Sequence, residues 1–253
     1  MNWHGCYTLF VKEVRRFWKV IGQTVGAPVV TSLLYLLVFH QVLEGRVDVY
    51  AGVSYTAFLI PGLIMMSVIQ NSFANTSSSL TQSKIQGNLV FLLLTPISAF
   101  ELYIAYIGAT LIRAALVAIA LYVVAQVFAL VPIERPVLML VMLILSSGSL
   151  AVLGLIAGIL ADKFEHLAAF QNFFIMPLAF LSGVFYSIQS LPAFWQAASH
   201  YNPVFYMIDG FRHGFFGVSD VNPALSVAGV GLFFVVISTI CILMLRRGYK
   251  IRS

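Results

Sequence analysis

The stretch VLMLVMLILSSGSLAVLGLIAGIL, Val137–Leu160, contains no charged side chain. A helix needs about 20 apolar residues to cross the roughly 30 Å hydrocarbon core of a bilayer, and this stretch is long enough. Its run Leu138–Leu145 does not alternate between apolar and polar residues, as a strand of a transmembrane barrel would. The stretch therefore predicts a membrane-spanning helix.

Further stretches have the same character, with their charges confined to the ends. They are, roughly, Val20–Leu43, Phe58–Leu80, Arg113–Val131, Leu167–Ile188 and Ala224–Leu245. The 253 residues are 60% hydrophobic and only 9% charged, which is more apolar surface than one soluble core could bury. We therefore predict an all-α polytopic membrane protein with six transmembrane helices, forming a single transmembrane domain over residues 1–253.

The cations predict the orientation, because Lys and Arg near helix ends are retained on the cytoplasmic side. With the N-terminus inside, the outer segments hold only Arg46, Arg135 and Arg212, and almost all other cations lie in the inner segments. We expect both termini in the cytoplasm. This placement also explains the net charge of +5 without a nucleic-acid partner. Because Cys6 and Cys241 fall toward the cytoplasmic side, no disulfide is expected.

Three segments outside the spans have patterns of their own. Residues 1–19 place an apolar stripe among basic residues, which predicts an interfacial helix on the inner leaflet; the alternative is a basic flank of the first span. Residues 82–100 are too short to cross the membrane and predict a cytoplasmic coupling segment, in which Ile85, Leu89 and Leu92 or Leu93 fall near helical spacing.

The third such segment, residues 187–220, is external and rich in aromatic residues. Ser190 before Leu191 and Pro192, and Asn202 before Pro203, predict two helix starts, and Gly217 predicts a stop. We expect two short re-entrant helices between the fifth and sixth spans. One additional full span is the alternative, but it would place the C-terminal cations outside.

Polar residues within the spans indicate helix contacts or a wet cavity. The second span runs into Asn71, Asn75 and several Ser and Thr residues, which serve either as hydrogen-bonding contacts between helices or as substrate contacts. Gly154 and Gly158 form a GxxxG pattern that favours close helix packing. If the third span begins at Arg113, this residue snorkels to the inner interface, whereas a start at Leu102 would bury it at mid-membrane. We expect the first.

Catalytic motifs do not occur in the sequence. The five histidines never approach a metal-ligand spacing such as HExxH, and no lysine follows a glycine as a phosphate-binding P-loop requires. The spans contain no charged residue other than Arg113, although ion-driven carriers place paired ionisable groups there. The chain is therefore not expected to be an enzyme, and energy for transport would come from another subunit.

Four blocks of sequence resemble the ABC type-2 transporter permease family, specifically its YadH-like members. They are KEVRRFWK at 12–19, FLIPGLIMMSVI at 58–69, LLLTPIS at 92–98 and FLSGVFYSIQSLPAFWQAASHYNPVFYMIDGFR at 180–212. The resemblance implies the ABC type-2 exporter fold and a half-transporter in the bacterial cytoplasmic (inner) membrane. Two permease chains would pair with two separate ATPase subunits, which would hold the ATP and Mg²⁺, with no cofactor in this chain and with membrane lipid around it.

The same resemblance implies roles for particular residues. The segments matching the coupling region would place these residues against the ATPase: Lys84, Ile85, Leu89, Leu92, Leu93, Thr95, Pro96, Arg15 and Arg16. The second and fifth helices would line a central substrate path that includes Met65, Met66, Asn71, Phe73, Asn75, Phe173, Phe174 and Met176. A lipid-linked saccharide, a lipid or an amphipathic drug would suit such a path. A passive channel or scaffold is the alternative from another functional class.

Overall fold

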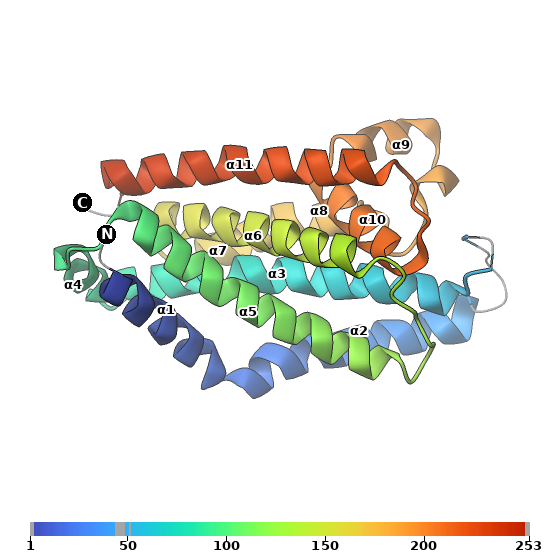
Figure 1. Ribbon diagram of the computed structural model, residues 1–253, viewed down its shortest axis with the longest axis horizontal. Coiled ribbons are helices and arrows are strands. Elements are labelled where there is room, and N and C mark those ends of the chain that lie inside the picture. Colours follow the sequence, from blue (N-terminus) through green and yellow to red (C-terminus); the bar gives the residue numbers. More distant parts are fainter. Residues whose placement is uncertain (1–2, 44–48, 51, 251–253) are drawn as a thin grey trace.

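The computed structural model describes residues 3–43, 49–50 and 52–250, which form an elongated bundle of helices (Figure 1). The elements, in chain order, are α1 (Trp3–Trp18), α2 (Ile21–Leu43), α3 (Tyr55–Ile85), α4 (Asn88–Leu94), α5 (Ala99–Ala125), α6 (Pro136–Leu160), α7 (Phe164–Phe170), a π-helical turn (Gln171–Ile175), α8 (Met176–Phe180), a 3-10 turn (Ile188–Ser190), α9 (Ala193–His200), α10 (Pro203–Phe216) and α11 (Pro223–Arg247). Within these ranges the only β pairing is an isolated bridge between Tyr50 and Val53.

The helices α2, α3, α5, α6 and α11 are each long and apolar enough to cross a membrane. Large apolar side chains are exposed along α2, α5 and α11, as lipid-facing surfaces require, for example at Leu34, Val123 and Leu232. The predicted class of polytopic, helical membrane protein is confirmed. The predicted fifth span differs, because its helix runs from Phe164 through a π-helical turn and ends at Phe180 instead of continuing to Ile188.

Helix α3 is the centre of the bundle and packs against α2, α5, α6 and α10. Its closest neighbour is α6, because the glycines there leave room for the α3 backbone. A Cβ atom on Gly154 would collide with Thr76 Oγ1 and the Phe73 carbonyl, and one on Gly158 would lie 3.1 Å from the Ser77 carbonyl. The GxxxG pattern is thus a packing motif, as predicted.

Helix α5 begins at Ala99, so the predicted start at Arg113 is wrong. Ser98 caps the helix by accepting from the Glu101 backbone N–H, while the Glu101 carboxylate accepts from the Ser98 N–H in return. This capping box fixes the start of the helix. At 1.5 Å per residue, Arg113 therefore lies about 21 Å along α5.

Contacts at Asp162 show that α3, α6 and the C-terminal helix end at the same side of the molecule. Lys84, near the end of α3, donates to the carbonyls of Ile159 and Ala161, near the end of α6, at 3.0 and 2.9 Å, and pairs with Asp162 at 3.4 Å. Lys250, beyond α11, pairs with Asp162 at 3.7 Å. The Lys250 and Lys84 cations lower the pKa of the Asp162 carboxyl. Helix α4 and the start of α1 lie at this end in Figure 1, and α9 and α10 lie toward the other.

Two short helices form the segment 187–220, as predicted, although their surroundings differ from the expectation. Asn202 caps α10 at Val204, and Gly217 ends it with a positive φ of 65°. Helix α9 begins at Ala193, after Pro192, so Ser190 is not its cap. Helix α10 packs against α3, α6 and α11 and is buried along most of its length. How deeply these helices would enter a bilayer stays a prediction.

Arg212 is not the outer flanking cation that the sequence predicts, because it is buried within the bundle with only 1% of its surface exposed. Its guanidinium donates to the Gly183 carbonyl at 2.8 Å and lies 3.8 Å from the centre of the Phe58 ring. These contacts hold α10 against the part of α3 around Phe58. The residue therefore contributes to packing between helices and not to a solvated flank.

Candidate functional site: a polar groove along α3

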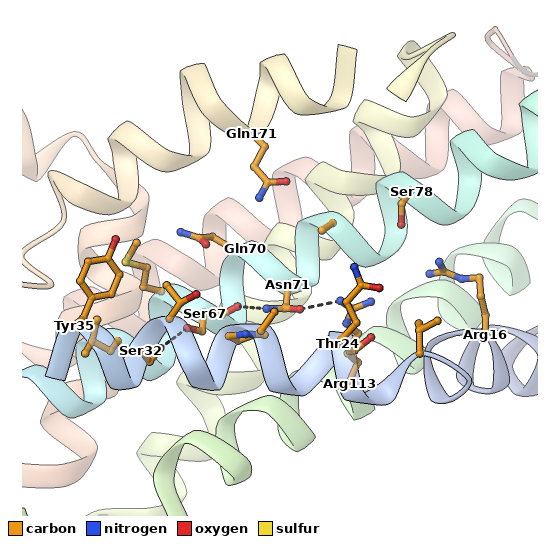
Figure 2. A pocket seen from close by; sticks show the side chains of 18 residues that line it. Arg16, Thr24, Ser32, Tyr35, Ser67, Gln70, Asn71, Ser78, Arg113 and Gln171 are labelled. Atoms are coloured by element: carbon orange, nitrogen blue, oxygen red, sulfur yellow. Dashed lines mark hydrogen bonds between the residues drawn. The ribbon is translucent and has the colours of Figure 1, made fainter. Parts of the chain in front are cut away.

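A groove of about 570 Å³ runs between α2 and α3, with Arg113 of α5 and Gln171 of the π-helical turn in its wall (Figure 2). Twelve of its 18 lining residues carry a hydroxyl, amide or guanidinium group, which is unusual among apolar spans. Its lining residues are Arg16, Val20, Gln23, Thr24, Ala27, Pro28, Thr31, Ser32, Tyr35, Leu63, Met66, Ser67, Gln70, Asn71, Ala74, Ser78, Arg113 and Gln171. This is a polar cavity next to lipid-facing helices, as functional sites in membrane proteins are.

Arg113 is directed to the middle of α3. Its guanidinium donates to Asn71 Oδ1 at 2.8 Å and to Asn75 Oδ1 at 3.1 Å. The predicted snorkelling to the inner interface is therefore wrong, because the charge is held by two amides within the bundle. Asn75 also donates to Thr110 at 2.7 Å, so α3 and α5 are joined by a continuous chain of hydrogen bonds.

Helix α1 enters the same network through Arg16 and Glu13. Arg16 donates to the carbonyl and to Oδ1 of Asn75, each at 2.8 Å, and pairs with Glu13 at 3.1 Å. The Glu13 carboxylate is fully buried and also accepts from the Ser79 hydroxyl at 2.6 Å. Sequence reasoning assigned no role to Glu13, although its four-residue spacing from Leu9 and Phe17 places all three on one helix face.

The predicted path residues separate into three groups. Met66 and Asn71 line the groove. Met65 and Phe73 are fully buried among the packed helices, and Asn75 lies behind the groove wall, where it holds the two arginines. Phe173 and Phe174 lie in the π-helical turn, where both are largely exposed, and Met176 is the first residue of α8. Of the predicted path residues, the groove includes Met66 and Asn71, and a substrate path here stays a prediction.

Helix α4 does not present the predicted apolar stripe. Leu89 is only 4% exposed and packs into the chain's own core with Leu9 and Leu80, so its assignment to an exposed face is wrong. Leu92 is half-buried, while Ile85 remains exposed. Among the described side chains of α4, the exposed apolar ones are Val90, Phe91 and Leu94, and Phe91 is 70% exposed. An unpartnered apolar face therefore exists, but it lies on the opposite side of the helix.

The other predicted coupling residues have mixed surroundings. Thr95 ends α4 by donating from its hydroxyl to the Leu92 carbonyl at 2.6 Å, and Pro96 follows it on the surface. Arg15 is exposed, whereas Arg16 belongs to the groove network. Lys84 donates a hydrogen bond to the Ala161 carbonyl at the end of α6 and forms an ion pair with Asp162. Leu93 lies in α4, but its side chain is outside the described part of the structure.

Metal binding finds no support in this geometry. Within residues 3–43, 49–50 and 52–250, no group of three or more His, Cys, Asp or Glu side chains could hold a metal ion. The groove offers hydrogen-bond donors, acceptors and two guanidinium groups instead. No carboxylate is among the lining residues of the groove. Its wall can therefore bind and orient a polar or anionic group.

Comparisons with known proteins agree with this architecture. Residues 4–216 match the model of the ABC-2 type transporter family. The chain is 36% identical over 254 aligned residues to the inner membrane transport permease YadH of Escherichia coli K12. This alignment covers 100% of this chain and 99% of that protein. It is 26% identical to nodulation protein J of Rhizobium leguminosarum bv. viciae, over 81% of this chain and 79% of that protein. Together with the apolar spanning helices, these matches show that the chain is a membrane permease subunit belonging to the ABC-2 type transporter family.

Proposed function

We propose that this chain is the membrane half of an ATP-driven exporter and moves an amphipathic substrate out of the cytoplasm or the inner leaflet. The observation that carries the proposal is the polar groove beside lipid-facing helices, since it offers a polar headgroup a route past the hydrocarbon core. The full-length similarity to a transport permease supports the same class.

The energy source in this proposal is a separate ATPase subunit. The sequence has no glycine followed by lysine, so it has no P-loop of its own. The exposed Val90, Phe91 and Leu94 of α4 lie at the end of the bundle that also holds the basic last turns of α3 and α11, and they form the docking face that we assign to the ATPase. Apolar side chains at such a contact would be withdrawn from water on docking.

The assembly in this proposal contains two permease chains and two ATPase chains in the bacterial inner membrane, with both permease termini in the cytoplasm. Phe173 and Phe174, exposed beside the groove, support a second permease copy as the opposite wall of the path. A closed twofold arrangement is the common form for such oligomers. ATP and Mg²⁺ would then bind on the ATPase subunits.

The test is reconstitution of the purified chain with the ABC ATPase subunit that co-purifies with it from its native membrane. Native mass measurement should give two permeases and two ATPases, and substrate flux into vesicles should require ATP and both subunits. Flux through the permease alone, without ATP, would identify a passive channel and reject the proposal.

A further inference from the structure

Two cations of the groove lie close together. Arg16 and Arg113 donate to the same atom, Asn75 Oδ1, at 2.8 and 3.1 Å, so their guanidinium groups are neighbours. The shared amide oxygen is neutral and cannot balance two positive charges, which repel each other most strongly away from bulk water. The groove wall thus concentrates positive charge at one point.

The neighbouring carboxylate does not remove this excess. Glu13 is fully buried, is not among the groove-lining residues, and pairs with Lys12 at 3.1 Å as well as with Arg16. The single negative charge of Glu13 therefore cannot balance the three positive charges nearby, on Lys12, Arg16 and Arg113. No Asp or Glu lines the groove along its described length. An anion entering the groove would be attracted, and a cation would be repelled.

Unpaired donors lie in the same wall. Arg113 Nε and Gln70 Nε2 are both withdrawn from solvent and have no hydrogen-bond partner. A buried donor without an acceptor costs free energy, which a ligand oxygen in the groove would recover if the Arg113 or Gln70 side chain rotated toward it. Two guanidinium groups and an amide N–H in one groove match an oxyanion with several oxygens, because the guanidinium fork donates two parallel hydrogen bonds to phosphate.

Exposed apolar side chains lie on the same elements that line the groove. Leu34 and Val38 are exposed on α2, and Phe173 and Phe174 are exposed next to Gln171. A ligand whose headgroup occupies the groove would therefore lay an alkyl chain against exposed apolar side chains. Free phosphate would gain nothing from these residues.

We propose that the groove binds the phosphate group of an anionic amphipath through Arg113 and Arg16. This inference rests on the proposed function, since it takes the groove as the substrate path and narrows the substrate class. Lipids and lipid-linked saccharides that carry phosphate fit the site. Cationic amphipathic drugs do not.

The test measures binding of radiolabelled dodecyl phosphate to the full-length chain in phosphatidylcholine nanodiscs, without ATPase or nucleotide. Empty nanodiscs give the partitioning background. We expect saturable binding that weakens at least tenfold in Arg113→Gln. Gln70→Glu keeps the side-chain shape while adding a negative charge to the groove, and it should weaken binding similarly. Arg246→Gln removes a cation from the end of α11, outside the groove, and should bind as the wild type does.

Competition identifies the part of the ligand that is recognised. Unlabelled dodecyl phosphate should displace the probe, whereas dodecyltrimethylammonium, with the same chain and opposite charge, should not. Displacement by inorganic phosphate at equal concentration would show that the alkyl chain contributes nothing to binding. It would reject the proposal that the ligand is an amphipath. Equal binding by the wild type, Arg113→Gln and Gln70→Glu would reject the proposal that the phosphate binds in this groove.

The absence of ATP from the assay separates this inference from the proposed function. If the wild-type protein showed no specific binding of dodecyl phosphate but still transported substrate with ATP, the phosphate site alone would be rejected. Specific binding in a protein that transports without its ATPase would reject the proposed exporter and leave the site standing.

Discussion

Arg16 of α1 donates to both the backbone carbonyl and the side-chain oxygen of Asn75 in α3, each at 2.8 Å. A helix that the sequence places before the first span is thereby fixed to the middle of the most buried helix of the bundle. Arg113 donates to the same side-chain oxygen, so a single amide joins α1, α3 and α5.

Asn75→Ala should destabilise the protein, because it leaves both arginines without this acceptor. Each buried polar group that loses its partner costs about 1–3 kcal/mol. Thermal unfolding in detergent should therefore show a clearly lower midpoint than the wild type. Asn172→Ala, at an exposed asparagine on the π-helical turn, is the matched control and should leave the midpoint unchanged. Equal midpoints for both variants would contradict a stabilising network.

Gly154→Ala should disrupt the contact between α3 and α6, because the added Cβ would overlap Thr76 Oγ1 and the Phe73 carbonyl. Overpacking of a tight interface costs about 1–3 kcal/mol or more. The control is Gly229→Ala in α11, where an added Cβ meets nothing within 4 Å and alanine is the better helix former. The yield of monodisperse protein and its thermal midpoint should fall only for Gly154→Ala. Wild-type behaviour of that variant would mean that the helices separate at little cost.

Phe91→Ser should weaken the association with the ATPase. Removing a phenylalanine from an apolar contact costs about 1.5–3 kcal/mol, so we expect at least tenfold weaker co-purification. Phe194→Ser is the control, because Phe194 is 73% exposed on α9, toward the opposite end of the bundle, against 70% for Phe91. Insertion into the membrane should be normal for both. If the two variants retained the ATPase equally, α4 would not be the docking face.

Leu89→Asp cannot serve for this purpose. Its side chain packs against Leu9 and Leu80, so a charge there would disturb the fold before any docking was measured.

The orientation can be measured with single cysteines and an impermeant thiol reagent. Glu134→Cys, in the loop between α5 and α6, should react from outside, and Glu165→Cys, near the start of α7, should react only after the membrane is opened. Both side chains are exposed, so access to the reagent decides the result. The native Cys6 and Cys241 are buried and should contribute little background. External labelling at position 165 would reverse the proposed topology.

The sequence predicts most of this fold because long apolar runs leave few alternatives to spanning helices. The ends of α2, α6 and α11 fall within about two residues of the predicted spans. The start of α5 was missed, although Ser98 and Glu101 have the spacing of a capping box and could have indicated it. Once α5 begins at Ala99, Arg113 cannot lie at its end.

Other features cannot be predicted from periodicity. A helical repeat in α4 shows that one face is apolar, but it does not tell which apolar residues contact the chain's own core. Leu89 faces that core and Phe91 does not, because α1, α3 and α5 close over the former. The grouping of Arg16, Glu13 and Arg113 around Asn75 likewise depends on how three separate helices cross.

The length of α3 has a mechanical consequence. Its 31 residues extend about 46 Å, well beyond the roughly 30 Å hydrocarbon core, in one helix from Tyr55 to Ile85. Lys84 fastens one end to α6, and Arg212 contacts Phe58 near the other. Since α4 follows α3 after only two residues, a force applied to α4 would act on the end of a stiff lever. Tilting of α3 would then carry that displacement to the opposite membrane surface, where α10 would move with it.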